Sequence, residues 1–416
     1  MASKVMFTAV PKPEHVPDEL VVDFNIFGEP QLLEDLHGRV LGLARNAPPI
    51  FWTPYNGGAW LLSSHDAVFK ASRDPDSFTS EFMAFDEVRA MRAALGPDDP
   101  HILMPTPINM DPPVHTAYRA PLQTAFSPKA MLAVREDIRT LCISLIEAVK
   151  DQGGCEFMEA IAEPLPVRFF LRLFGLPEDK HKEYRALVDE HNNNREYDRA
   201  KTQRMLQKLA GVMHDTIMDR KENPRGDLIS LLWNSMIDGQ PTTLNDIEDY
   251  CVVLFLAGLD TVMNGMGLGI RHFALHPDLQ ANVRADLRLV PDVTEEILRR
   301  YTFTIPPRMV AKDMVFEGVT MKRGEVAYLF LPAADLDASE FPKPQTFDLN
   351  RENKAHIAFG TGPHRCLGSH LARIELQVLY EEMLPRLPEF RIDPDRPPVF
   401  HGGTVLGPEK LWIMWD

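Results

Sequence analysis

The chain has 416 residues, of which 44% are hydrophobic and 25% are charged, and its formal net charge is −16. A balance this acidic argues against nucleic acid or an anionic membrane as the main partner. The 35 prolines are scattered, which indicates many helix ends and turns rather than a low-complexity tract. The length allows either two domains or one large domain.

The cysteines are few and form no C-x-x-C pair: Cys142, Cys155, Cys251 and Cys366. This usage is typical of a reducing compartment, without a disulfide framework or a structural zinc site. We expect the first three to be small buried hydrophobes. Residues 1–20 hold no apolar run of signal-peptide length, and the longest apolar stretch, residues 251–259, is far short of the roughly 20 residues of a membrane span. We therefore expect a cytoplasmic protein.

In chain order, the first predicted element is a hairpin at residues 50–63, where the Asn56-Gly57 turn separates two apolar runs. A helix should follow, with Ser64 as its N-cap. Residues 80–110 hold four prolines and no clean period. We therefore expect a long irregular loop there, and such loops within a compact domain are usually functional.

From about residue 112 to residue 290 the pattern is mostly helical. The longest predicted helix runs from Leu244 to about Leu275, which corresponds to roughly 45–50 Å. It is apolar on most faces, so we expect it to be buried.

After Tyr301 the chain becomes irregular and β-like, with short strand candidates at residues 314–316, 319–321 and 326–331. A Gly-rich loop then leads into a helix from Leu367 to about Leu384. We therefore expect a mainly α protein with a small β-rich region: β-rich parts at about 45–65 and 302–332, and helical parts at about 112–290 and 367–385.

The strongest functional signal is the loop from Phe359 to Gly368, which reads F-G-T-G-P-H-R-C-L-G. Gly360 and Gly362 permit backbone conformations closed to other residues, so the loop can bring N–H groups close to a sulfur. Cys366 then lies at the entrance of a helix, whose positive end favours a thiolate. A thiolate held in this way is a good axial haem ligand. The alternative is a structural cysteine in a Gly-rich turn.

A second signal lies within the long helix, where Ala257-Gly258-Leu259-Asp260-Thr261 interrupts the apolar run. A carboxylate buried beside a hydroxyl is costly without a partner or a purpose, and Gly258 costs the helix about 1 kcal/mol relative to Ala. The Thr261 hydroxyl can bond back to the carbonyl four residues earlier and bend the helix. We therefore expect the helix to open here, so that something small approaches its backbone. The alternative is a helix end with Asp-Thr as an ordinary cap.

These motifs resemble those of the cytochrome P-450 family, and the resemblance extends over nearly the whole chain. The chain is similar above all to the bacterial camphor-hydroxylase subfamily, in segments such as residues 110–113, 175–177 and 258–264. The resemblance implies a single cytochrome P-450 domain spanning residues 1–416. Its fold would be a triangular helical prism with the haem between the long central helix and the helix after the cysteine loop.

The resemblance also implies a role for each matching residue. Cys366 would bind the iron of haem b, and Asp260 and Thr261 would form an acid–alcohol pair that relays protons for O–O cleavage of O2. Further haem contacts would come from the cysteine loop, the long helix and a set of donors for the propionates, for which arginine is well suited. These residues are Phe359, Gly360, Gly368, Ala257 and Gly258, with His115, Arg119, Arg308 and His364 on the propionates.

Glu296-x-x-Arg299 places an acid and a base one turn apart on one helix face, a pattern that is common on surface helices. It matches the family's E-x-x-R motif, which implies a structural brace below the haem. The family often adds an arginine in a P-x-R-F element. Thr346 stands at that place here, which leaves the third partner of the brace unassigned.

The resemblance implies a haem-thiolate monooxygenase, which inserts one oxygen atom of O2 into a C–H bond and releases the other as water. Electrons would pass from NAD(P)H through a ferredoxin reductase and a [2Fe-2S] ferredoxin to a monomeric enzyme. Such ferredoxins are acidic, so we expect a basic docking face that includes Arg119, Lys354 and Arg365. Two alternatives remain open: a peroxide-driven haem-thiolate enzyme, whose relatives lack the acid–alcohol pair, and a non-enzymatic haem sensor or carrier.

The substrate pocket should be lined by the 80–110 loop, the long helix, the segment after Tyr301 and the C-terminal turn. Camphor hydroxylases use a tyrosine of this loop to bond the ketone; no tyrosine is present here, and His101 is the only bulky aromatic donor. We therefore expect a terpenoid or norisoprenoid of similar size, such as an ionone or a bicyclic monoterpene, rather than camphor. The wall residues are mostly apolar, which predicts a small apolar substrate: Phe82, Phe85, Leu103, Met104, Val253, Leu256, Ala257, Ile305, Thr404 and Val405.

Overall fold

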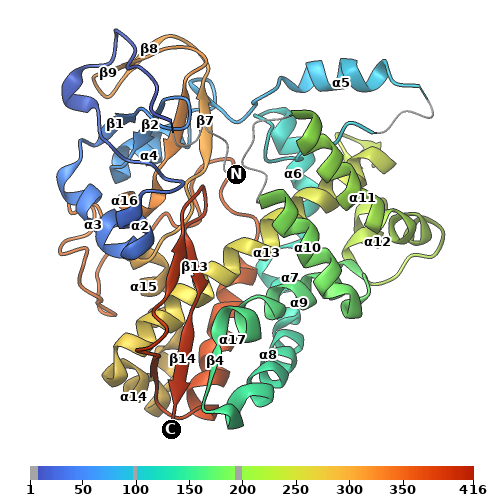
Figure 1. Cartoon of the computed structure of the whole chain (residues 1–416). Helices are drawn as coiled ribbons and strands as arrows, with labels where there is room; N and C mark the ends of the chain where they lie inside the picture. Colours follow the sequence, from blue (N-terminus) through green and yellow to red (C-terminus); the bar gives the residue numbers. More distant parts are fainter. Residues whose placement is uncertain (1–7, 97–100, 193–198) are drawn as a thin grey trace.

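One long helix organises the molecule in the computed structural model, which describes residues 8–96, 101–192 and 199–416 (Figure 1). Helix α13 (Leu244–Leu275) crosses the body, and a capping box between Thr243 and Asp246 starts it. The predicted buried helix is confirmed with both of its ends. Its length and composition would also suit a membrane span, but 61% of its most apolar window is buried, as in the core helix of a globular protein.

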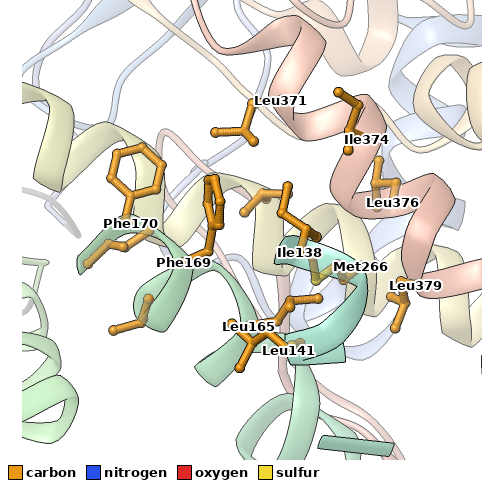
Figure 2. Packing of buried hydrophobic residues seen from close by; sticks show 14 of the residues in the cluster. Ile138, Leu141, Leu165, Phe169, Phe170, Met266, Leu371, Ile374, Leu376 and Leu379 are labelled. Atoms are coloured by element: carbon orange, nitrogen blue, oxygen red, sulfur yellow. The ribbon is translucent and has the colours of Figure 1, made fainter. Parts of the chain in front are cut away.

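The surrounding helices bury apolar stripes against α13 and against one another. Figure 2 shows part of this core, with buried side chains from four helices, among them Leu141, Phe169, Met266 and Leu376. Shared burial of this kind, rather than intrinsic propensity, holds such helices in place. The helical part comprises α6 (Val114–Ala125), α7 (Pro128–Ala133), α8 (Arg135–Val149), α9 (Pro164–Phe174), α10 (His181–Asn192), α11 (Arg199–Glu222), α12 (Leu228–Trp233), α14 (Pro277–Ala285), α15 (Val290–Arg300) and α17 (Ser369–Arg386).

The β-rich part is a five-stranded sheet with the order β1-β2-β10-β7-β3. The predicted hairpin is confirmed, and Asn56 adopts the left-handed φ of +61° that its turn needs. Ser64 caps the next helix through the backbone N–H of Ala67, as predicted. Its strands are β1 (Ile50–Thr53), β2 (Ala59–Leu62), β3 (Phe78–Thr79), β7 (Pro307–Val310) and β10 (Val326–Leu329). A separate hairpin is formed by β8 (Met314–Phe316) and β9 (Val319–Met321). The helices of this part are α2 (Pro30–Glu34), α3 (Leu36–Asn46), α4 (His65–Ala71) and α16 (Leu331–Ala334).

Several short strands were not predicted. A three-stranded sheet has the order β11-β14-β4, and β12 and β13 form a separate hairpin near the C-terminus. The helical part is therefore not purely helical between residues 112 and 290, because β4 and the β5–β6 pair interrupt it. These strands are β4 (Gly154–Glu156), β5 (Met236–Ile237), β6 (Gln240–Pro241), β11 (Phe390–Ile392), β12 (Val399–His401), β13 (Gly407–Lys410) and β14 (Trp412–Trp415).

The prediction of a wholly irregular loop at residues 80–110 is wrong. Helix α5 (Phe85–Ala93) lies within it and extends away from the body (Figure 1). It buries only Val88, so its sequence carries no apolar period that could reveal it. Arg92, in its last turn, donates to the Asp249 carboxylate of α13 at 2.7 Å and thereby ties the segment to the long helix.

Candidate active site

The cysteine loop is shaped by two left-handed glycines. Gly360 and Gly362 have φ values of +66° and +72°, and a β-carbon on Gly362 would lie 2.4 Å from the carbonyl oxygen of Ser72. The backbone N–H of Cys366 donates to the carbonyl of Phe359 at 2.8 Å, which closes the loop just before α17 begins. The loop geometry therefore requires these glycines.

The Cys366 sulfur lies in a mixed electrostatic environment. Burial raises its pKa, while the Gly368 backbone N–H and the guanidinium groups of Arg119, Arg373 and Arg365 lower it by less. The donors at the helix entrance therefore act in the expected direction, although desolvation outweighs them. A metal cation bound to the sulfur would supply the missing stabilisation.

The other three cysteines are buried, as expected, whereas Cys366 is exposed. Ala257 is likewise exposed in an otherwise buried stretch of α13, and the neighbouring Leu256 is half-buried. Open surface thus occurs on the long helix and on the cysteine loop, which is where the family places the two faces of a haem. The residues present fit such a flat group.

The four predicted propionate donors come together. The imidazole rings of His115 and His364 are 4.3 Å apart, and Arg119 and Arg308 both lie close enough to act on His115. Burial, followed by these cations, lowers the pKa of His115 to about 4. Neither ring nitrogen of this buried histidine has a partner within the described protein, so an anionic ligand such as a propionate would meet free donors and cations.

Sequence reasoning missed the partners that orient these donors. The Ser80 hydroxyl and a His364 ring nitrogen are 3.0 Å apart, and the Asp111 carboxylate lies 3.8 Å from the same nitrogen. Asp111 also accepts from the Ser80 backbone N–H and raises the pKa of Arg308, which burial lowers to about 10. Asp111 belongs to one of the segments that carry the resemblance, which was the available clue.

On α13 the Thr261 hydroxyl donates to the Ala257 carbonyl at 2.9 Å, as predicted. The Asp260 carboxylate accepts a bond of 2.6 Å from Arg185 of α10, a partner that sequence spacing could not reveal. The prediction that the helix opens at Gly258 for something small to approach its backbone is wrong. A β-carbon there would lie 2.2 Å from the ring of Phe170, so the glycine allows close packing against α9.

The brace of Glu296 and Arg299 has a third member, which is not the residue at the position where the family often has an arginine. Arg299 donates two bonds to Glu296, of 2.7 and 2.8 Å. Arg351 is the third member and the second cation: it lies 3.4 Å from the Glu296 carboxylate and donates to the backbone carbonyl of Thr346 at 2.8 Å. Thr346 therefore takes part through its main chain, and the arginine stands five residues later.

The predicted substrate wall is only partly open. Phe82, Phe85, Leu256 and Val405 are half-buried, Thr404 is exposed, and Leu103, Met104 and Val253 are buried. Ile305 has 0% exposure and belongs to the core beside α3, so it offers no surface to a ligand.

His101 faces the protein rather than an open space. One of its ring nitrogens is 2.9 Å from the Glu248 carboxylate, and the other is 3.8 Å from Asp249. Both acids belong to α13, so the loop that holds His101 is fixed to the long helix by ion pairs.

The proposed docking cations differ in their surroundings. Arg365 is exposed, whereas half-buried Arg119 donates to the Arg365 carbonyl. Lys354 is exposed and bonds to Asp292 at 2.8 Å. Arg365 and Lys354 are therefore the exposed cations of the three, and Lys354 is already paired with a carboxylate.

Glu295 braces the cysteine loop from α15. It accepts two bonds from Arg373, of 2.6 and 2.8 Å, and the Arg373 guanidinium lies 4.5 Å from the ring centroid of Phe359. His356 lies 3.1 Å from the same carboxylate. Burial opposes ionisation of Glu295, but the bonds to His356 and Arg373 together outweigh it and lower its pKa to about 2.

Replacing Glu295 with Gln should therefore lower the free energy of unfolding by about 1–3 kcal/mol near neutral pH. The depressed pKa means that the native carboxylate stabilises above the ordinary value of 4.5 and loses this contribution as the pH falls toward 2. Urea denaturation at about pH 7 and about pH 4 should show a smaller penalty at the lower pH. Asp292→Asn, which removes an exposed pair, should cost under about 1 kcal/mol. An equal penalty at both pH values would contradict the ionised pairing.

Comparison with known proteins identifies the family. The family model of cytochrome P450 matches residues 179–413. The chain is 32% identical over 417 residues to a probable cytochrome P450 127A1 of Sinorhizobium fredii, with 97% of each chain covered. Cytochrome P450-terp of a Pseudomonas species is 30% identical over 379 residues, which are 86% of this chain and 87% of the relative. The chain therefore belongs to the cytochrome P450 family.

Solved structures agree with this assignment. The crystal structure of CYP101J2 superposes with a TM-score of 0.86 at 30% identity, over 98% of this chain and 100% of that chain. The predicted family and its fold are confirmed. The protein is a cytochrome P450 monooxygenase, an oxidoreductase, and membership of the family implies haem and O2.

Proposed function

We propose that this P450 hydroxylates a small apolar terpenoid or norisoprenoid, such as an ionone or a bicyclic monoterpene. The balanced reaction takes a C–H bond, O2, two electrons and two protons, and yields an alcohol and water. The observation that carries the substrate class is the hydrogen bond of 2.9 Å between the His101 Nδ1 atom and Glu248, because it turns the one bulky aromatic donor of the loop toward α13. The similarity to cytochrome P450-terp supports the same class.

The proposed wall is apolar and lies on three elements. It comprises the segment around α5, the exposed and half-buried face of α13 and the C-terminal hairpin loop, and it leaves out Ile305. A pocket of this kind selects by shape and apolar contact, with few polar groups to orient the ligand. Its residues are Phe82, Phe85, Leu103, Met104, Val253, Leu256, Ala257, Thr404 and Val405.

The haem site is proposed on the residues that fit it. Cys366 would hold the iron, and the four clustered donors His115, Arg119, Arg308 and His364 would hold the propionates. When bound, the haem supplies the activation of O2. The chain's own part is to enclose the group, to orient the donors through Asp111 and Ser80, and to hold a proton at the Thr261 hydroxyl.

For electron supply we propose NAD(P)H, a ferredoxin reductase and an acidic [2Fe-2S] ferredoxin that docks beside the cysteine loop. The exposed guanidinium of Arg365 supports this position. Lys354 and Arg119 would add positive charge to the same docking face. Steering by opposite charge would act mainly on the association rate. We propose that the enzyme works as a cytoplasmic monomer.

The test is a binding titration of the haem-loaded protein with β-ionone, a bicyclic monoterpene and camphor, followed through the spin-state change of the haem spectrum. We expect β-ionone or the monoterpene to give the tight shift and camphor to give a weak one. Product analysis with a surrogate ferredoxin and reductase should then show an alcohol. A tight camphor shift, or no shift with any terpenoid or norisoprenoid, would overturn the proposed substrate.

A further inference from the structure

The side chain of Asn264 joins the long helix to the C-terminal hairpin. Asn264 is 1% exposed, and its amide nitrogen donates to the backbone carbonyl of Asp260 at 2.7 Å. Its amide oxygen lies 3.1 Å from the Nε2 atom of His401, at the end of β12. One buried amide therefore touches both the oxygen-side helix and a hairpin more than 130 residues away in sequence.

The direction of both bonds follows from the chemistry of the groups. A backbone carbonyl can only accept, so the Asn264 nitrogen must face Asp260 and the Asn264 oxygen must face His401. That oxygen can also only accept, so the His401 Nε2 atom must carry a hydrogen. The contacts therefore form a directed series, in which His401 donates to Asn264 and Asn264 donates to Asp260.

The hairpin is shaped for this contact. His401 and Gly407 are cross-strand partners of β12 and β13. A β-carbon on Gly407 would lie 1.9 Å from the Asn264 amide oxygen, so only glycine allows the hairpin backbone to approach this closely. On the other side of His401, a β-carbon on Gly402 would lie 2.3 Å from the carbonyl oxygen of Ile26. Close approaches on both sides fix the position of His401.

The loop between the two strands comprises residues 402–406 and belongs to the proposed substrate wall. It holds Thr404 and Val405, and it is anchored by the bond from the Ile305 backbone N–H to the Thr404 carbonyl at 2.7 Å. Val405 also forms a bridge with Thr304. Because these bonds hold the loop, we infer that a ligand in contact with it also affects His401, where the loop meets β12.

The other end of the series lies at the acid–alcohol pair. Asp260 carries both the carbonyl that Asn264 holds and the carboxylate that Arg185 holds, and Thr261 is the next residue. A side-chain donor on a helical carbonyl competes with the main-chain bond and tilts that peptide. The orientation of the Asp260–Thr261 peptide thus depends on where Asn264 is held.

We propose that His401 is a positioning residue for the oxygenation reaction. Through Asn264 it couples the substrate loop 402–406 to the Asp260–Thr261 peptide, so that protons are delivered efficiently only when the hairpin is seated. The inference rests on the proposed function, in which Val405 contacts the substrate and Asp260 and Thr261 relay protons. Misplaced proton delivery diverts O2, two electrons and two protons to hydrogen peroxide instead of alcohol and water.

The test compares His401→Phe, which loses the donor, with His401→Gln, whose amide nitrogen can still donate. The haem-loaded proteins are reduced by a surrogate ferredoxin and its reductase with β-ionone present, and hydrogen peroxide is measured per NADH oxidised. We expect His401→Phe to raise the peroxide fraction at least about threefold, since small misplacements of reacting groups have large effects. His401→Gln should stay close to the wild type, and His401→Phe should also change the solvent isotope effect on turnover.

Two further variants separate positioning from plain structural support. Asn264→Leu breaks the same series, so the double variant with His401→Phe should be no worse than the worse single variant. His65→Phe, at a half-buried histidine of α4, should leave the peroxide fraction unchanged. The proposal is overturned if His401→Phe couples like the wild type, if His401→Gln is as uncoupled as His401→Phe, or if the two single effects simply add.

The proposed substrate can fail independently of this inference. If the wild type forms no product from β-ionone, the substrate class is wrong. The partition of NADH-derived electrons between peroxide and water still reports proton delivery in that case. The same rise in peroxide for His401→Phe alone is then expected, and its absence overturns the role of His401.

Discussion

Replacing Arg299 with Lys should destabilise the protein by about 3 kcal/mol, because the charge is kept but buried acceptors of the guanidinium lose their hydrogen bonds. Arg299 is 1% exposed and uses its whole guanidinium. Two nitrogens bond Glu296, one of these also bonds the Pro344 carbonyl, and the third bonds the Asp335 carbonyl at 2.9 Å. A lysine ammonium is a point donor and cannot reproduce this planar fork.

The measurement is the denaturant midpoint of the haem-loaded protein, together with the yield of soluble haem-loaded enzyme. Arg288→Lys is the matched control, because Arg288 is exposed and pairs only with Asp286, and it should change stability by less than about 0.5 kcal/mol. If Arg299→Lys unfolds within about 1 kcal/mol of the wild type, the brace is not the buried network described above.

Replacing Thr261 with Ala should lower the yield of oxygenated product by about a hundredfold, within the range typical of a lost proton donor. Consumption of NADH should continue, with hydrogen peroxide in place of the alcohol. The physical reason is that the Thr261 hydroxyl, bonded to the Ala257 carbonyl at 2.9 Å, is the only side-chain hydroxyl of the Ala257–Thr261 turn.

Thr261→Ser keeps a hydroxyl at the same place and should recover most of the product yield. Product and peroxide are measured in the same reaction, so a general loss of activity is distinguished from uncoupling. A Thr261→Ala enzyme that turns most of its NADH into product would remove Thr261 from the proton relay and favour another donor.

The elements that were predicted correctly are those with local signals. The bounds of α13 follow from a long, mostly apolar segment with a capping residue at its start, and Ser64 and Asn56 mark a cap and a turn by their own chemistry. The pairing of β14 with β4 joins residues more than 250 positions apart through strands of four and three residues, which no local pattern reveals. Helix α5 was missed because a helix that buries one side chain has no apolar period.

The same division applies to the site. The positions of Cys366 and the four propionate donors follow from motifs at fixed spacing, and the structure brings those donors together. The contact of Asp111 with His364, of Arg185 with Asp260 and of Arg351 with Glu296 is defined only by the tertiary structure. The helix entrance beside Cys366 shows in the sequence, whereas the desolvation that opposes it depends on the whole fold.

The central claim is that the Cys366 sulfur is the axial ligand of a haem iron, and the spectrum of the reduced, CO-bound protein tests it most directly. Thiolate ligation predicts the distinctive red-shifted absorption band in the wild type and its loss in Cys366→Ser, while Cys142→Ser keeps it. A wild-type spectrum without that band, or a Cys366→Ser variant that retains both the band and full oxygenase activity, would contradict the account.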